Sequence, residues 1–303
     1  MIELMIIYVV GLVLLGMVLG SFVNALVWRF HEQDEVNDEL FDLRERQQAK
    51  RTAARDKRMK QLEDRLAALS MSKGRSMCSN CSHPLAPKDL MPLLSWLWLG
   101  GKCRYCKQPI PDTPWLEAGL PLVFVVSYFA WPMELQGYGL LAFCFWLVSA
   151  TALAALLVYD LRWFLLPDRI VWPLVGLMTV QVLLHAIVFD GGTAAIGNAF
   201  WGIATASGFF WFLYLISRGR WIGFGDVKLG IALGMMVGGP LLGMMVVFLA
   251  SLLGSLASLP LLFRKKLKAD SAIPFGPFLI VATFILVLFG QDVSELLKSY
   301  LIL

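Results

Sequence analysis

The chain has 303 residues, of which 58% are hydrophobic and 16% are charged. Together with a mean hydropathy of +0.69, these fractions exclude an ordinary soluble domain and indicate that lipid is the main solvent of the chain. The net charge of +4 is explained by topology signals and by attraction to anionic inner-leaflet lipids, so we expect membrane lipid and no nucleic acid among the partners.

Eight apolar runs are candidates for helices that cross about 30 Å of hydrocarbon. They cover residues 5–28, 115–131, 139–159, 170–189, 194–216, 227–238, 241–263 and 275–290. The sixth run is short, so we expect it to tilt little, to thin the bilayer locally or to be continued by the preceding loop. The sequence therefore predicts an all-α polytopic membrane protein with about eight transmembrane helices.

The distribution of Lys and Arg predicts the orientation, because cytoplasmic loops carry the excess of both residues. With the N-terminus outside, the inner segments hold all but one of the chain's 26 Lys and Arg residues. These inner segments are 29–114, 160–169, 217–228 and 264–274. We therefore expect a multi-pass protein of the bacterial cytoplasmic (inner) membrane, with its large polar insert on the cytoplasmic side.

The insert divides the chain into four predicted parts. They are a first transmembrane helix at 1–30, a charged helical segment at 31–72, a four-cysteine module at 73–114 and a transmembrane core at 115–303. Residues 32–72 contain no Gly or Pro, so an exposed helix or helical pair with many opposite-charge neighbours is expected there. A spacer, a surface for a partner helix and a substrate-docking element remain open as roles for this segment.

Two C-x-x-C pairs give the strongest metal signal in the chain. They consist of Cys78, Cys81, Cys103 and Cys106. Four thiolates at this spacing close tetrahedrally around one zinc ion, and a reducing cytosolic side argues against disulfides. Because four sulfurs leave no open coordination position, the zinc is expected to be structural. His83 is a possible substitute ligand but is expected to be a loop residue, and Cys144 is expected to belong to the apolar core.

Two aspartates at the ends of apolar runs need separate explanations. Asp160 closes the third run, where the helix dipole disfavours an anion, so capping does not account for it. Asp168 stands directly before the fourth run, where a carboxylate caps free backbone N–H groups, and we expect it to act as an N-cap. An ionisable group at a membrane boundary favours a functional role for Asp160.

Asp226 follows two glycines in the tetrapeptide Gly223-Phe224-Gly225-Asp226. The glycines permit backbone conformations closed to other residues and close approach of a substrate strand. The third and sixth runs bring Asp160 and Asp226 to the same membrane face, where two nearby carboxylates share a proton and activate water. Lys228 is expected to extend toward lipid headgroups, with a tuning role in the active-site loop as the alternative.

Two other classes compete with a hydrolase. A proton-coupled transporter also uses intramembrane carboxylates, but it usually has inverted repeats and places them near the midplane. A membrane adaptor with a zinc module explains the insert, yet it leaves both aspartates without a purpose. An aspartic hydrolase accounts for all of these features.

The ordered motifs resemble those of the bacterial type IV prepilin peptidases, which are intramembrane aspartic proteases of the G-x-G-D class. The similar segments are Gly20 to Asn24 with Arg29, Arg75-Ser76, Leu93 to Trp96, Pro114 to Glu117, Leu166 to Asp168, Gly223 to Leu229 and Pro274 to Phe278. The resemblance implies that Asp160 and Asp226 form the catalytic pair. It also implies cleavage of a basic leader from type IV prepilins or type II secretion pseudopilins on the cytoplasmic side.

Many members of this family then methylate the new N-terminus with S-adenosylmethionine, so the resemblance implies a second activity and a second cofactor beside zinc. The chain departs from the family at the charged segment 32–72 and at Arg29-Phe30-His31, where Arg-Leu-Pro is typical. A peptidase without methyl transfer is therefore the alternative.

Overall fold

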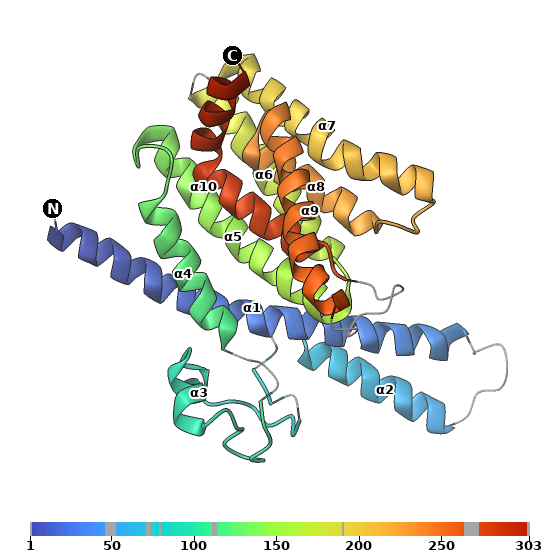
Figure 1. Ribbon diagram of the computed structural model, residues 1–303. Helices are drawn as coiled ribbons and strands as arrows, with labels where there is room; N and C mark the ends of the chain where they lie inside the picture. The colour runs from blue at the N-terminus through green and yellow to red at the C-terminus, as the bar shows by residue number, and fades with distance from the viewer. Residues whose placement is uncertain are drawn as a thin grey trace. The chain divides into compact units, whose positions relative to one another are not determined.

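The computed structural model describes residues 2–45, 53–70, 74, 76–78, 80–110, 114–189, 191–263 and 273–301. Parts of the predicted charged segment and Arg75 lie outside these residues. The described chain is helical and contains no strand, only two isolated β-bridges, which confirms the all-α prediction. The chain divides into two compact units, Met1–Val125 and Val126–Leu303 (Figure 1).

The first unit is built around one long helix. Helix α1 (Ile2–Glu45) continues from the first apolar run into the charged segment without a break. It is followed by α2 (Ala53–Ala68), η2 (Pro87–Leu90), α3 (Leu94–Leu99) and most of α4 (Trp115–Phe129). Gly16 and Gly20 let α4 approach, since a Cβ at Gly16 would lie 2.6 Å from Pro121 Cα. Small residues four apart commonly bring membrane helices this close.

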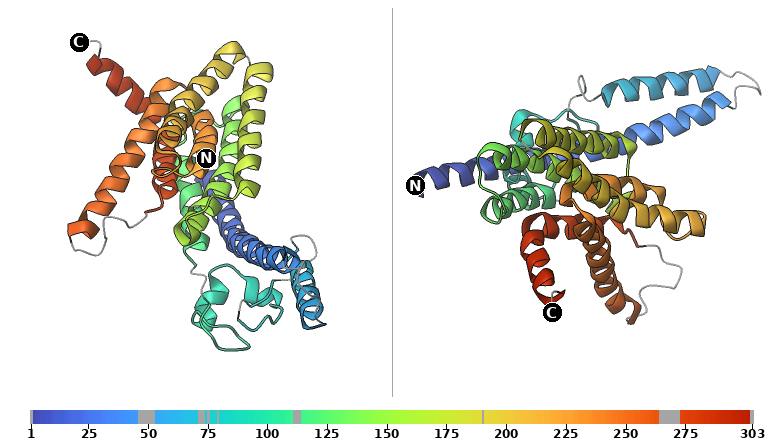
Figure 2. Two further views of the ribbon diagram at one scale, coloured as in Figure 1. Left: turned by 90° about the vertical axis from the view of Figure 1, so that its right-hand side faces the viewer. Right: turned by 90° about the horizontal axis from the view of Figure 1, so that it is seen from above.

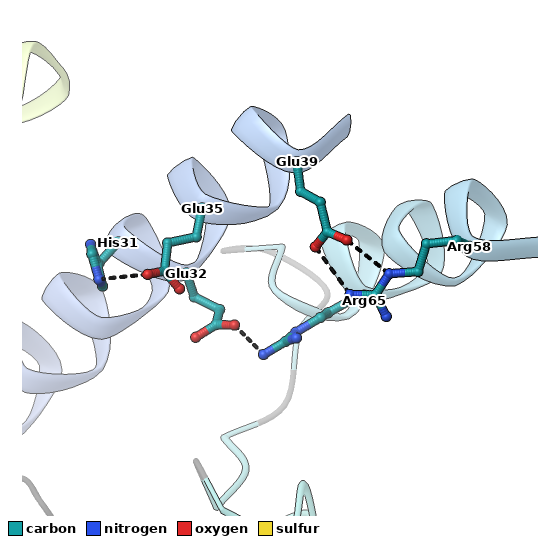
Figure 3. Close-up of polar contacts among 6 residues, drawn as sticks. All are labelled: His31, Glu32, Glu35, Glu39, Arg58 and Arg65. Carbon is teal, nitrogen blue, oxygen red and sulfur yellow. Dashed lines mark hydrogen bonds and ion pairs between the residues drawn. The ribbon is translucent and has the colours of Figure 1, made fainter. Parts of the chain in front are cut away.

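Helix α2 runs alongside the C-terminal half of α1, as Figures 1 and 2 show. A small apolar core joins the two helices and consists of Val36, Leu40, Leu62 and Leu69. Figure 3 shows that Arg58 and Arg65 reach from α2 to Glu39 and Glu32 on α1. The segment is therefore a helical pair that buries a narrow apolar stripe and pairs charges along its edges.

The second unit is a bundle of membrane helices. Its elements are α5 (Gly137–Trp163), α6 (Asp168–Val188), α7 (Gly192–Ser217), α8 (Phe224–Val237), α9 (Pro240–Phe263) and α10 (Gly276–Leu301). Helix α8 packs against α6, α7, α9 and α10, which explains how so short an apolar helix is accommodated. Helix α8 is surrounded mainly by other helices and less by lipid. Its length therefore need not match the hydrocarbon thickness of the bilayer.

Glycines set the spacing of α7, α8 and α9. Gly202 of α7 and Gly234 of α8 touch so closely that a Cβ on either would collide with the other's carbonyl oxygen. Gly230 meets Ser207 in the same way, and the Ser207 hydroxyl donates to the carbonyl of Val227 at 2.8 Å. Such close backbone packing replaces the hydrophobic effect, which is weak between helices in lipid.

Six described helices are long and apolar enough to cross a membrane. They are α1, α5, α6, α7, α9 and α10, whereas α4 and α8 have 15 and 14 residues. The eight predicted runs thus appear as six full-length spans and two shorter helices. The protein is a multi-pass membrane protein.

Candidate functional site

Asp160 lies in the last turn of α5 and is 6% exposed. Its carboxylate accepts a hydrogen bond from the backbone N–H of Gly276, the first residue of α10. A Cβ at Gly276 would lie 2.5 Å from Asp160 Oδ2. Only glycine therefore lets the start of α10 approach the carboxylate this closely.

Asp226 occupies the first turn of α8, where the helix dipole favours a negative charge. Its half-buried carboxylate accepts the backbone N–H of Gly223, the N-cap residue. This contact is the half of a capping box in which the third helical residue reaches back to the cap. The carboxylates of Asp160, from α5, and Asp226, from α8, lie within reach of each other's charge.

The glycines of the tetrapeptide act differently from the expectation. Neither Gly223 nor Gly225 has a positive φ, and Gly223 has an extended backbone that other residues also adopt. A Cβ at Gly225 would lie 3.2 Å from the side chain of Leu166. Gly225 is thus explained by close packing against the α5–α6 loop, and special backbone geometry is not the reason.

Two predictions about the neighbouring charges are wrong. The N-cap of α6 is Pro167, which makes no side-chain cap, and Asp168 is the first helical residue. The Asp168 carboxylate instead forms an ion pair with Lys228, whose side chain is 14% exposed and lies 5.5 Å from the ring centre of Phe224. Lys228 therefore faces the protein and does not extend to the headgroups. The pair joins the first turns of α6 and α8.

The four predicted cysteines converge in the first unit. Their sulfur atoms all lie within 4.8 Å of one another, and Cys78 Sγ is 3.9 Å from Cys106 Sγ. A tetrahedral zinc ion with bonds of about 2.3 Å holds its sulfurs roughly 3.8 Å apart, so the cluster has the dimensions of a zinc site. The backbone N–H of Cys106 lowers the pKa of the Cys103 thiol to about 7, whereas the backbone N–H of Gln108 is outweighed by burial and the neighbouring thiols, which raise the pKa of the Cys106 thiol to about 11. The thiols thus titrate as one cluster.

The two C-x-x-C segments fold alike. The N–H of Cys78 donates to the His83 carbonyl at 3.0 Å, and the N–H of Cys103 donates to the Gln108 carbonyl at 2.9 Å. Ser82 and Lys107, which follow the second cysteine of each pair, both have a positive φ. The His83 ring packs against Tyr105 at a tilt, with ring centres 3.8 Å apart, as expected for a packed loop residue. Each segment is thus a tight loop whose backbone presents two sulfurs.

Sequence reasoning missed two contacts of the aspartate site. Gly276 supplies a hydrogen-bond donor to Asp160, and Leu166 packs on Gly225. Gly276 lies between Pro274 and Pro277 at the start of an apolar run. This pattern in the sequence could have indicated a special backbone contact at Gly276. Nothing local in the sequence links Leu166 to residue 225.

The fold and the sites define a class: a polytopic helical membrane protein with a carboxylate pair at its helix ends and a four-thiol cluster in a separate unit. Residues 14–131 match the family described as Bacterial Peptidase A24 N-terminal domain, and residues 147–259 match the Type IV leader peptidase family. No solved structure matches the chain.

Curated relatives agree with this assignment. The chain is 34% identical over 231 residues to a prepilin leader peptidase/N-methyltransferase of Aeromonas hydrophila, and the alignment covers 73% of each chain. It is 30% identical over 291 residues to a protein of the same name from Pseudomonas aeruginosa, covering 95% of this chain and 92% of the relative. The chain belongs to the type IV leader peptidase family.

Proposed function

We propose that this protein removes the basic leader from type IV prepilins or type II secretion pseudopilins, with Asp160 and Asp226 as the catalytic pair. The observation that supports the proposal is the electrostatic interaction between these two carboxylates, each of which also has a backbone N–H as a neighbour. The named activity of the relatives supports the reaction type.

The chemistry follows from the pairing. In a catalytic pair, two carboxylates hold one proton between them, because neighbouring like charges do not both ionise readily. The ionised carboxylate takes a proton from water, and the resulting hydroxide attacks the scissile carbonyl carbon. The protonated carboxylic acid then gives its proton to the departing amine, so the peptide C–N bond breaks with the addition of one water molecule.

The excess of Lys and Arg in the inner segments supports an active site at the cytoplasmic face of the inner membrane. In this orientation the N-terminus lies outside. The four cysteines fit a structural zinc ion by their number, spacing and donor chemistry. The ion would hold the two loops of the module together and would take no part in cleavage.

We also infer methyl transfer to the new N-terminus, supported by the names of the relatives. S-adenosylmethionine would supply the methyl group. The alternative, a peptidase alone, differs only in this second step.

Incubation of the purified chain in detergent with a tagged prepilin, with and without S-adenosylmethionine, tests the proposal. We expect mass spectrometry to find the mature pilin, and to find it one methyl group heavier when the cofactor is present. Absence of cleavage in active membranes and in detergent contradicts the peptidase. An unmethylated product at saturating cofactor establishes the alternative.

A further inference from the structure

The second unit contains a cavity of about 330 Å³ to which the proposed reaction assigns no role. It is lined by residues 131–133, the starts of α5, α7 and α9, the ends of α6 and α8, and the middle of α10. Asp160 and Asp226 lie at the opposite ends of α5 and α8. At 1.5 Å per residue, Asp160 is about 27 Å along α5 from the lining residue Ala142.

This separation places the cavity relative to the membrane. It is close to the thickness of the hydrocarbon region, about 30 Å. The cavity therefore lies at the membrane boundary opposite to that of the two aspartates. In the orientation proposed above, this is the outer boundary.

The wall of the cavity carries no permanent charge, because none of its lining residues is Asp, Glu, Lys or Arg. Hydrogen-bonding side chains line it instead, namely Tyr138, Ser149, Gln181, His185, Asn198 and Gln291. A phosphate would find no permanent cation here, and an ammonium group would find no anion. The cavity therefore suits a ligand that is uncharged in the part that the wall contacts.

Burial divides the wall into an accessible edge and a deeper floor. Asn198 and Gln291 are exposed, and their side chains form no hydrogen bond with any residue that the structure describes. Trp146, Met178 and Leu286 are buried. The amides at the edge are thus available to donate to a ligand, while the floor beneath them is mainly apolar.

The edge is held in place by contacts within the protein. The His185 ring stacks on Tyr138 with ring centres 3.9 Å apart, and Gln181 Nε2 donates to Tyr138 Oη at 3.4 Å. The backbone N–H of Gly239 donates to the Asn198 carbonyl at 2.7 Å. The polar edge is therefore formed before a ligand arrives.

Methionines indicate the shape of the ligand. Four of them line the cavity, namely Met133, Met178, Met235 and Met236. Their unbranched, flexible side chains adapt to apolar groups that have no fixed shape. The volume lies at the lower end of the range of about 300–1,000 Å³ for sites that surround a drug-sized ligand. Such a cavity encloses part of a flexible chain and leaves the rest of a larger amphiphile outside.

We propose that this cavity holds the glycerol ester region and the first part of one acyl chain of a membrane lipid. The ester groups of a glycerolipid lie between the hydrocarbon and the headgroups, at the depth of the cavity. Their carbonyl oxygens accept hydrogen bonds from the amides of Asn198 and Gln291, and the chain contacts the methionines. The headgroup is not recognised, because the lining offers it no charge.

Photo-crosslinking of the full chain in detergent tests this site with a radiolabelled diacylglycerol that carries a diazirine near the carbonyl end of one chain. We expect label on peptides with lining residues, from 131–149, 178–199, 235–242 or 286–291. Unlabelled phosphatidylcholine and phosphatidylglycerol should compete equally, within about threefold. Label confined to other peptides, or a larger headgroup preference, overturns the proposal. Displacement by prepilin but not by unlabelled diacylglycerol assigns the cavity to the substrate and also overturns it.

Two alanines of α7 provide a matched pair of variants. Ala199 lines the cavity and is 7% exposed, whereas Ala204 is exposed and does not line it. Ala199→Phe should raise the concentration for half-maximal labelling of the lining peptides by about tenfold or more, because its ring occupies the space of the chain. Ala204→Phe adds the same ring outside the cavity and should label as the unchanged protein does.

A second variant keeps the test independent of the fold of Ala199→Phe, which limited proteolysis verifies. Asn198→Leu removes an amide donor from the exposed edge and should raise the same concentration by about fivefold. Thermal unfolding gives a further readout, because a ligand that binds only the folded state stabilises it. Added diacylglycerol should raise the melting temperature of the unchanged protein more than that of Asn198→Leu. Labelling and stabilisation that are equal in the unchanged protein and in every folded cavity variant overturn the assignment.

Discussion

The contacts that stabilise the interior of each unit differ between the two units. In the first, Gly16 and Gly20 let α1 and α4 pack closely, but the cytoplasmic part depends on exposed ion pairs such as Arg58–Glu39 and on side chain to backbone hydrogen bonds such as that from Gln33 to the Leu69 carbonyl. In the second, glycines bring helix backbones together, and most Ser and Thr hydroxyls donate to carbonyls of their own helix. Polar contacts of the first kind suit water, and close backbone packing suits lipid.

This contrast extends to the proposed chemistry. The two aspartates lie in the tightly packed bundle, whereas the thiols lie in the unit whose cytoplasmic part is organised by polar contacts. Changes in one unit should therefore leave the chemistry of the other largely intact, and four predictions test this separation.

The largest effect is expected at the carboxylate pair. Asp160→Asn or Asp226→Asn should lower the rate of leader cleavage by on the order of 10³ or more, because one carboxylate cannot both accept and donate the proton. Binding of the methyl donor should persist in both variants. Cleavage of a tagged prepilin and equilibrium dialysis measure the two properties. Asp292→Asn, an exposed carboxylate of α10, is the control, and near-normal cleavage by either dyad variant rules out the assignment.

Metal content is the next test. Cys78→Ser or Cys106→Ser should remove about one zinc ion per chain and expose the cysteine module to protease, because binding and folding are coupled in small zinc sites. Elemental analysis and limited proteolysis measure both. Cys144→Ser should keep the metal; this cysteine of α5 is exposed and does not belong to the apolar core as the sequence had suggested. A freshly reduced sample of the unchanged protein without metal contradicts the proposed zinc site.

The packing of the bundle gives a smaller effect. Gly234→Ala should destabilise the second unit by about 1–3 kcal/mol, because the added methyl collides with the backbone of α7. Gly208→Ala in α7 has open space around it and should be neutral or slightly stabilising. Thermal unfolding in detergent compares the two variants. Equal melting temperatures would mean that α7 and α8 do not touch at Gly234.

The smallest effect concerns the α1–α2 pair. A hydrogen bond from Arg58 lowers the pKa of Glu39 below its ordinary value of 4.5. The contact therefore stabilises the pair fully above pH 4.5, and this stability is lost as the pH falls through the lowered pKa. Thermal unfolding should show Glu39→Gln slightly less stable than the unchanged protein at neutral pH. If the melting temperatures of Glu39→Gln and the unchanged protein still differ by the same amount in strong acid, the ion pair is not the cause of the difference.

The sequence was sufficient where the signal is local. Apolar runs, the spacing of the cysteines and the charge of residues 32–72 each predict a feature from neighbouring residues alone, and the helical fold and the thiol cluster follow them. The electrostatic pairing of Asp160 with Asp226 could be anticipated because both lie at run ends on one predicted face.

The remaining features depend on tertiary contacts. Asp168 is a good N-cap by its position, yet Lys228 from another helix offers its carboxylate a charged partner, and the ion pair forms instead. Gly276 and Leu166 matter through residues more than fifty positions away in sequence. No rule based on local propensity or periodicity reports such contacts.

The unbroken course of α1 has a mechanical consequence. At about 1.5 Å per residue, its 44 residues span roughly 66 Å, more than twice the hydrocarbon thickness. Gly16, Arg29 and Leu40 of this single helix make three different contacts, with α4, with the carbonyls of Ser70 and Gly74, and with α2. One residue inserted between Arg29 and Leu40 would turn one contact by about 100° relative to the others, whereas seven would turn it by only about 20°. Insertions and deletions in this stretch should therefore be tolerated in steps of whole helical turns.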